Sequence, residues 1–273
     1  ESQLEDREVL TREETIQQAA AQAVEAAKVK TLRQYAGAVY LPEKAATVSE
    51  KTRASYTQLL EQHVFPVLGD VPMQDITAAM LKALLAGLPE RFAFASRVKV
   101  YAVLHGMFKA AVMDDTLDVN PMDKVPRPKQ SKDAALSAEH KAFTAEEMRY
   151  ILRCLKEEPL KWQAFVLLLI DTGCRRGEAC GLQWRAVDLD AGTITIERNL
   201  QYTAARGVYE TMPKNGKVRV VDISPDVAEL LRALRRTQPV TVRWVFTQDD
   251  SAEPMHPDTP TRYFQRFGKR FGI

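Results

Sequence analysis

A proline-rich, basic stretch divides this 273-residue chain into two halves with different hydrophobic patterns. Residues 120–140, NPMDKVPRPKQSKDAALSAEH, contain three prolines, several basic side chains and little apolar periodicity. Proline fixes φ and lacks a backbone N–H, so such a stretch favours an extended connection over a packed element. We therefore predict an interdomain linker at residues 125–141, one domain at 30–124 and a second at 142–273.

The first half is predicted to be all-helical. Apolar residues recur there at helical spacing in four segments, with glycine and proline between them. The four segments are residues 32–40, 49–67, 77–87 and 96–113. We therefore predict a domain of about four helices.

The second half mixes helical and strand patterns. Thr144 with Glu147 makes a capping box, and Gly173 is a plausible helix stop. Asn215-Gly216 is the strongest local signal for a tight turn, so the flanking strands are predicted to form a hairpin. One expected helix begins after Thr144, and the others cover residues 161–171, 176–182, 225–236 and 260–271. The expected strands cover 193–196, 208–212 and 218–223. The predicted fold class is mainly α with a small antiparallel β-sheet.

The formal charge of +2 is unevenly distributed along the chain. Residues 1–27 carry seven acidic and two basic side chains, which leaves 36 basic and 29 acidic residues, a net +7, on the rest. Residues 1–29 are predicted to form an exposed acidic helix or linker, and the basic remainder permits a polyanionic partner. The longest apolar run, residues 164–170, is too short to cross a bilayer, and the acidic start does not resemble a signal peptide, which favours a cytoplasmic protein. Three cysteines at no metal-ligand spacing suggest neither a disulfide framework nor a zinc site.

Arg175 is the first candidate for chemistry. It follows a Thr-Gly break and opens the next predicted helix, where backbone N–H groups and the helix dipole favour anions. A guanidinium suits a phosphate because it is a planar two-pronged donor that keeps its charge. Glu178 lies on the same helical face and can hold the arginine in place. The alternative is an exposed Arg–Glu pair, which is the commoner explanation for an isolated Arg-x-x-Glu.

Lys214 is the second candidate. A lysine beside a tight turn projects from a rigid tip, where it can enter a groove or donate a proton to a leaving oxygen. Lysines beside turns more often protect a sheet edge, a role equally open to Lys217 and Arg219.

These two segments together resemble the sequence boxes of one enzyme family. TGCRRGEACGLQW and, some forty residues later, PKNGKVRVVDIS resemble the first arginine box and the β-hairpin lysine box of the tyrosine recombinases, which include phage and conjugative-transposon integrases. Upstream, SEKTRASYTQLLEQHVFPVLGDVPMQDIT and NPMDKV resemble the family's helical core-binding domain and its linker. The resemblance covers about residues 30–273 and implies a helical core-binding domain followed by a mixed α+β catalytic domain.

The resemblance implies a site-specific DNA recombinase that cleaves and rejoins strands through a 3′-phosphotyrosine. It makes Arg175 the first catalytic arginine, Glu178 the acidic residue that supports it, and Lys214 the general acid. It implies no metal and no cofactor, double-stranded DNA as the partner, and a homotetramer on paired DNA sites.

The sequence departs from the family pattern on its C-terminal side. The family's second arginine lies in a His-x-x-Arg motif before the nucleophilic tyrosine, yet none of the four histidines here has an arginine three residues later. Tyr263 precedes the place where that motif is expected, so a helix-packing role is its better interpretation. We expect the second arginine and the nucleophile beyond Ile273, in which case the 273 residues bind DNA without cleaving it.

Basic residues on the second and fourth predicted helices and in the linker are candidates for phosphate contacts, with salt-dependent affinity. They are Lys51, Arg53, Arg97, Lys99, Lys109, Arg127, Lys129 and Lys132. For each of them a solvated surface charge is about as frequent an outcome. Two other functions stay open, namely a non-catalytic DNA-binding regulator or degenerate recombinase, and a helical interaction scaffold suggested by the acidic N-terminal segment.

Overall fold

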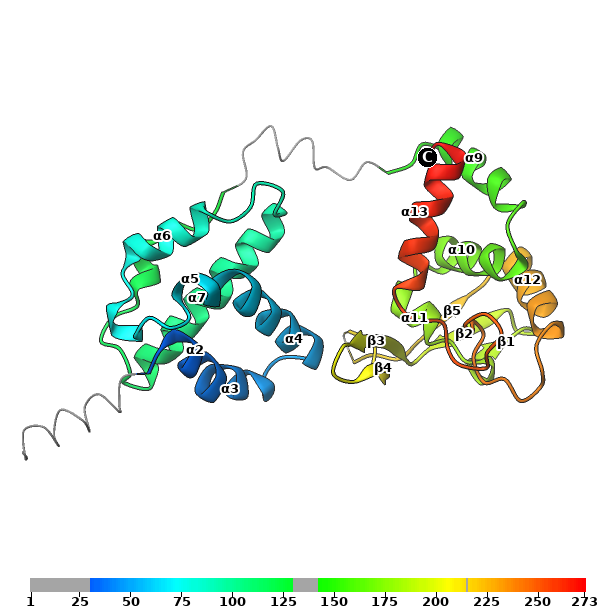
Figure 1. The fold of residues 1–273 in the computed structure, drawn as a ribbon. Helices are drawn as coiled ribbons and strands as arrows, with labels where there is room; N and C mark the ends of the chain where they lie inside the picture. The colour runs from blue at the N-terminus through cyan, green and yellow to red at the C-terminus, as the bar shows by residue number, and fades with distance from the viewer. Residues whose placement is uncertain (1–29, 130–141, 215) are drawn as a thin grey trace, which may run out of the picture. The chain divides into compact units, whose positions relative to one another are not determined.

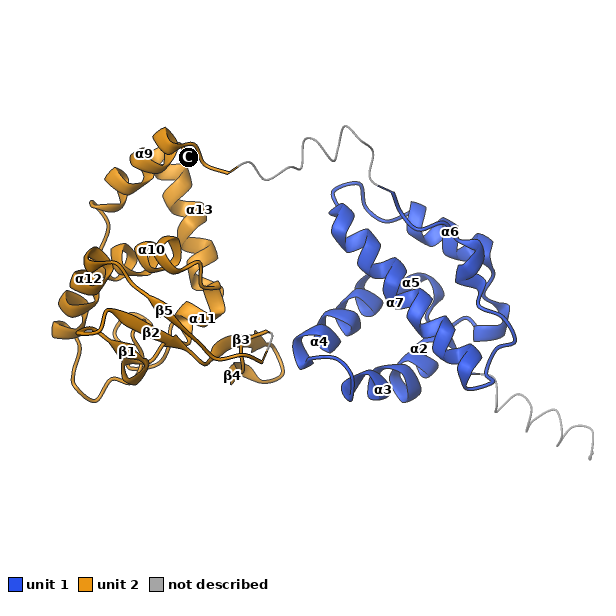
Figure 2. Ribbon diagram, turned by 180° about the vertical axis from the view of Figure 1, so that it is seen from behind, with its two compact units in different colours: residues 1–139 blue, residues 140–273 orange. Residues whose placement is uncertain are grey.

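The computed structural model describes residues 30–129, 142–214 and 216–273, so the predicted acidic helix and most of the predicted linker lie outside the described residues. The chain divides into two compact units, Glu1–Glu139 and His140–Ile273 (Figure 2). Each has its own hydrophobic core. Helices dominate and the sheets are small and antiparallel, which confirms the predicted fold class. Within the described ranges, every helix is too short or too polar to cross a membrane.

Unit 1 is helical throughout its described part (Figure 1). Its elements are α2 (Leu32–Tyr35), η1 (Ala36–Tyr40), α3 (Leu41–Ala45), α4 (Glu50–Leu59), η2 (Leu60–Val64), α5 (Phe65–Leu68), η3 (Met73–Asp75), α6 (Ala78–Ala86), α7 (Phe94–Met113) and η4 (Pro121–Lys124). The first three elements run on without a break, as do α4, η2 and α5. With α6 and α7 they form the four long helical segments that the sequence predicts.

Side-chain caps and a buried helix explain why unit 1 folds in this way. The hydroxyls of Ser49 and Thr77 accept hydrogen bonds from the backbone N–H groups three residues later, at the starts of α4 and α6. Leu104, Met107 and Phe108 of α7 are fully buried, at the i, i+3 and i+4 spacing of one helical face. Each such side chain contributes roughly 1.5–3 kcal/mol to folding.

Unit 2 combines helices with two small sheets. Its elements are α9 (Ala145–Leu155), α10 (Leu160–Thr172), α11 (Arg176–Cys180), η5 (Trp184–Ala186), β1 (Val187–Asp188), β2 (Thr193–Ile196), β3 (Asn199–Thr203), β4 (Gly207–Thr211), β5 (Arg219–Asp222), α12 (Pro225–Arg236) and α13 (Thr259–Phe271). Strands β1, β2 and β5 form one antiparallel sheet, and β3 and β4 form another. The Thr144–Glu147 capping box and the left-handed Gly173 at the end of α10, with φ of 60°, are both confirmed.

The predicted hairpin across Asn215-Gly216 is wrong. A turn does form, since Gly216 has a positive φ of 66° and its N–H donates to the Pro213 carbonyl at 2.7 Å. The strands on either side, however, join different sheets, because β4 pairs with β3 and β5 pairs with β2. A turn signal determines only the local chain path, whereas a strand's partner is set by the pairing that buries its apolar face. Lys214 therefore lies in a connection between two sheets.

Candidate phosphate-binding site

The end of α10 and the start of α11 hold Arg175 in one backbone conformation. After the left-handed Gly173, the Cys174 N–H donates to the Thr172 hydroxyl at 3.3 Å. Arg175 is extended, with φ of −73° and ψ of 149°, and is the N-cap of α11. Its N–H donates to Glu178 Oε2 at 2.9 Å, which satisfies a donor that the helix itself leaves unpaired.

Glu178 lies at the centre of a cluster with two arginines. Its side chain is 0% exposed. Oε1 accepts from Nη1 of Arg175 at 3.0 Å and from Nη1 of Arg219 at 3.3 Å, while Oε2 accepts from Nη2 of Arg219 at 2.6 Å. Burial alone would raise the pKa of the Glu178 carboxyl, but the hydrogen bonds from Arg219 and Arg175 more than offset it and hold that pKa below its ordinary value. Glu178 is therefore ionised at neutral pH.

The cluster carries a net positive charge that faces solvent. Two guanidinium groups share one carboxylate, so one positive charge has no partner within the three residues. The side chain of Arg175 is 52% exposed and that of Arg219 is 37% exposed. Arg175 makes one side-chain bond to Glu178 and keeps other guanidinium N–H groups for an anion. A charged, fixed and half-exposed guanidinium is suited to a phosphate oxygen.

Two glycines bring α11 against β3 and so place the cluster. A Cβ on Gly177 would lie 2.7 Å from the Leu200 carbonyl oxygen and 2.3 Å from Oδ1 of Asn199. A Cβ on Gly181 would meet its nearest neighbours at 3.2–3.3 Å, a milder contact. Arg176 adds an attachment on the other side, because its Nη2 lies 3.1 Å from the Asp258 carboxylate just before α13. The short helix is therefore held from two directions.

Sequence reasoning paired Arg175 with Glu178 and missed Arg219, which it grouped with lysines that protect a sheet edge. The sequence of β5 contains no clear signal, because valines at 220 and 221 place apolar side chains on both faces of the strand, and only the structure shows which face is inward. Arg219 and Val221 are half-buried on one face of this strand, while Val220 on the other face is 64% exposed. An arginine on the inward face of a strand needs a partner. Glu178, on the buried side of α11, is that partner.

Lys214 is exposed, and no hydrogen bond or ion pair joins it to Arg175, Glu178 or Arg219 in the described part of the chain. Its predicted role as a general acid stays a prediction.

The basic residues predicted to contact phosphates fall into three groups. Six of them are exposed, namely Lys51, Arg53, Lys99, Lys109, Arg127 and Lys129. Lys132 lies outside the described residues. Arg97 is used differently, because its guanidinium donates to the carbonyl of Leu85 in the last turn of α6 and to those of Leu88, Pro89 and Phe92 after it. Arg97 therefore makes bonds within the fold, and its predicted contact with DNA stays a prediction.

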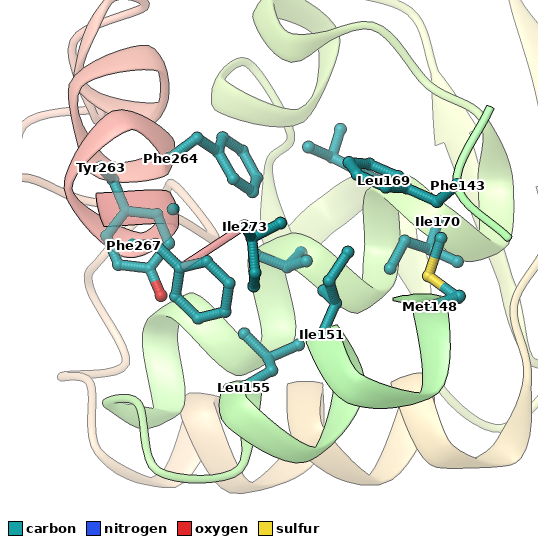
Figure 3. Close-up of a pocket in the computed structure, with 12 residues that line it drawn as sticks. Phe143, Met148, Ile151, Leu155, Leu169, Ile170, Tyr263, Phe264, Phe267 and Ile273 are labelled. Carbon is teal, nitrogen blue, oxygen red and sulfur yellow. The ribbon is translucent and has the colours of Figure 1, made fainter. Parts of the chain in front are cut away.

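Tyr263 packs inside unit 2, in agreement with its interpretation as a packing residue. Its ring stacks on Trp162 with centroids 3.7 Å apart, and its hydroxyl donates to the buried Glu158 at 2.9 Å. Burial, together with that hydrogen bond, raises the pKa of Tyr263. The ring also lines an apolar pocket of about 380 Å³ between α9, α10 and α13, in which Phe264, Phe267 and other apolar side chains converge (Figure 3). None of the three cluster residues lines this pocket.

The matches to known proteins all point to one family. Residues 141–273 match the sequence profile of the phage integrase family, and residues 32–127 match that of the phage integrase central domain. A putative prophage phiRv2 integrase of Mycobacterium tuberculosis is 28% identical over 187 residues, which are 67% of this chain and 46% of that protein. The integrase of Mycobacterium phage L5 is 27% identical over 190 residues, 68% of this chain and 48% of that protein. The chain thus spans about half the length of these curated relatives.

Solved structures share the fold. The integrase of the Tn1549 transposon, in complex with transposon right end DNA, has a TM-score of 0.73 and 20% identity, over 89% of this chain and 78% of that chain. A lambda integrase tetramer bound to a Holliday junction has a TM-score of 0.72 and 19% identity, over 93% of this chain and 70% of that chain. The two family profiles together cover most of both units, and the chain therefore belongs to the phage integrase family of tyrosine recombinases.

Proposed function

We propose that this chain comes from a site-specific DNA integrase, with residues 30–124 as its core-binding domain and residues 142–273 as part of its catalytic domain. The observation that carries the proposal is the half-exposed guanidinium of Arg175, fixed by the buried carboxylate of Glu178. Pre-positioned donors of this kind stabilise negative charge that develops on a phosphate during strand transfer. Membership in the phage integrase family supplies the substrate class.

In the proposed reaction Arg175 binds a non-bridging oxygen of the scissile phosphate, and Glu178 keeps its guanidinium in place. A tyrosine oxygen forms a bond to phosphorus and loses its proton to water, while the bond from phosphorus to the 5′-oxygen breaks. Lys214 gives that 5′-oxygen a proton, which leaves a 3′-phosphotyrosine and a free 5′-hydroxyl. The 273 residues contain no His-x-x-Arg, and Tyr263 is packed against Trp162, so we place the second arginine and the nucleophile outside them.

The proposed partner is double-stranded DNA, held by the exposed basic residues of α4, α7 and the segment after η4. Each phosphate that a lysine or arginine neutralises releases counterions, so the affinity must fall linearly with salt on a logarithmic scale. The solved relatives include a tetramer bound to a Holliday junction, and we propose a tetramer on two DNA sites for the complete protein.

DNA binding is tested with the 273-residue chain and a labelled 30-base-pair duplex, by fluorescence anisotropy between about 50 and 200 mM salt. We expect salt-dependent binding that Arg175→Ala weakens. Arg236→Ala removes the same charge from an exposed position at the end of α12 and serves as the matched control. No measurable binding at low salt would remove the DNA-binding proposal and favour an interaction scaffold.

Cleavage is tested with the complete protein and a nicked duplex that carries its site, by a search for a covalent adduct on a denaturing gel. Arg175→Ala is expected to abolish the adduct, whereas Tyr263→Phe is expected to retain it. A complete protein that binds its verified site but forms no adduct would instead be a non-catalytic DNA-binding regulator. In that case DNA affinity should survive replacement of both Arg175 and Lys214.

A further inference from the structure

We infer that Arg219 is a positioning residue of the phosphate site, which acts through Glu178 to hold the guanidinium of Arg175 in place. This inference rests on the proposed phosphate-binding role of Arg175. Arg219 is 41 residues away from Glu178 in the chain, yet it makes the more extensive of the two side-chain pairings with that carboxylate.

The contacts of the two arginines differ in kind. Arg219 bonds both carboxylate oxygens through two guanidinium nitrogens, at 2.6 and 3.3 Å. Arg175 makes a single side-chain bond, from Nη1 to Oε1 at 3.0 Å. A two-pronged pair fixes the plane of the carboxylate, which a single bond leaves free to rotate. The backbone N–H of Arg175 also donates to Oε2 at 2.9 Å, so Arg219 acts together with that bond to set where Oε1 lies. Oε1 in turn sets where the guanidinium of Arg175 lies.

The backbone of Arg219 is anchored independently of α11. Arg219 lies opposite Ile196 in the β2–β5 ladder, and Ile194 and Ile196 of β2 are buried. Arg175 and Glu178 instead belong to α11 and its N-cap, and α11 is only five residues long. A helix of that length has little stability of its own. The pairing between Arg219 and Glu178 thus ties the short helix to a sheet.

The buried charge of Glu178 is a further reason why Arg219 is needed to hold Arg175 in place. A buried carboxylate is strongly unfavourable unless its charge is compensated. The half-exposed Arg175 compensates the negative charge of Glu178 only in part. Loss of Arg219 would therefore make the carboxyl take up a proton at mildly acidic pH. A protonated carboxyl binds the guanidinium of Arg175 weakly. The other titratable and charged groups around Glu178 are Cys174, whose pKa is raised by burial, and Glu197 and Arg198, which line the same small cavity. Arg198 is paired with Glu210 at 2.6 Å.

The test uses the 273-residue chain with Arg219→Met, which removes the charge, and Arg219→Lys, which keeps it without the two-pronged geometry. Urea unfolding followed by tryptophan fluorescence identifies the conditions in which each variant is folded, since Trp162, Trp184 and Trp244 all lie in unit 2. The direct readout is the side-chain Nε–H signal of Arg175 in NMR spectra without DNA, assigned by its loss in Arg175→Lys. We expect restricted guanidinium rotation in the wild type and partly restricted rotation, which does not change with pH, in Arg219→Lys. In Arg219→Met we expect free rotation that increases as the pH falls from 8 to 5.5.

Binding of the labelled 30-base-pair duplex is the second readout. We expect Arg219→Met to weaken binding about as much as Arg175→Ala does, by roughly 10-fold, the effect of one lost charge-assisted contact. The double variant is expected to be no weaker than Arg175→Ala alone, because both substitutions remove the same contact. The loss in Arg219→Met is expected to grow as the pH falls, whereas Arg219→Lys should show a smaller loss that does not grow.

The two readouts separate this inference from the proposed function. An unchanged Arg175 signal in folded Arg219→Met overturns the inference even if Arg175→Ala weakens DNA binding. Losses that add in the double variant overturn it as well, since Arg219 would then act independently of Arg175. A mobile Arg175 signal in Arg219→Met, with DNA affinity indifferent to Arg175→Ala, supports the positioning role and contradicts the proposed phosphate role.

Discussion

Gly177 is where the packing of α11 on β3 can be tested most directly. A Cβ at this position would lie 2.7 Å from the Leu200 carbonyl oxygen and 2.3 Å from Oδ1 of Asn199. Asn199 can rotate only at the cost of its hydrogen bond to the Thr211 hydroxyl, at 3.0 Å. The Leu200 carbonyl belongs to the backbone of β3, which is paired with β4 along five residues and cannot move alone. Gly177→Ala should therefore displace α11.

The size of the effect follows from two opposing contributions. Overpacking of a tightly packed site costs typically about 1–3 kcal/mol. Alanine recovers up to about 1 kcal/mol because it is the better helix former. We expect unit 2 to lose about 1–2 kcal/mol, which lowers the urea midpoint by roughly 0.5–1 M for an m-value near 2 kcal/mol/M. Gly181→Ala, with its nearest contacts at 3.2–3.3 Å, should lower the midpoint less than half as much.

The assay is urea unfolding followed by tryptophan fluorescence. All three tryptophans lie in unit 2, so the transition reports that unit alone. Gly37→Ala in unit 1, where a Cβ would meet nothing within 4 Å, should leave this transition unchanged and controls for general effects of the substitution. Equal midpoints for Gly177→Ala and wild type would refute the argument that the close approach of α11 to β3 requires glycine.

Three further predictions concern charge and burial. The pKa of Glu178 is lowered in the folded state, so its ion pairs stabilise the protein above the unfolded-state pKa, and this stability is lost as the pH falls through the folded-state pKa. Glu178→Gln should therefore lower the urea midpoint of unit 2 at pH 7 and lower it much less near pH 3. A difference in midpoint that does not change with pH would contradict this. Arg97→Ala should destabilise unit 1 by about 2 kcal/mol, measured by unfolding followed by far-UV circular dichroism. It should leave the slope of log DNA affinity against log salt concentration unchanged, whereas Lys99→Ala should reduce the magnitude of that slope by about 0.9. Burial raises the pKa of the Cys174 thiol, and it raises the pKa of the Cys180 thiol to about 12. Both thiols should therefore react with a disulfide reagent at pH 8 only after urea is added. Rapid reaction of either thiol in the folded protein would count against its burial.

The features that could be predicted from the sequence are those whose partners lie a few residues apart. The capping box at Thr144 and Glu147 and the helix end at Gly173 depend on bonds within one turn of helix. The Arg175–Glu178 pair has the same short range. Local propensity and spacing therefore contain the information that these features need.

The features that were missed depend on distant parts of the chain. The turn at Gly216 forms as its sequence indicates, but β5 pairs with β2, which lies before β3 and β4 in the chain. The buried face of Ile194 and Ile196 needs a partner strand, and that requirement cannot be read from the turn residues themselves.

Arg97 and Arg219 show why a basic residue alone is weak support for a DNA contact. A guanidinium satisfies a helix-end carbonyl, a buried carboxylate or a phosphate with the same N–H groups, so charge and position on a helix or strand do not distinguish these partners. These partners are distinguished by the polar and charged groups that lie next to each arginine in the fold. The carbonyls of Leu88 and Pro89 accept bonds from Arg97, and the buried charge of Glu178 is paired with Arg219, so each arginine has a partner within the fold before any DNA is present. Arg175 differs because Glu178 already receives two bonds from Arg219, and about half of the Arg175 side chain is exposed, where it can reach the phosphate that we propose it binds.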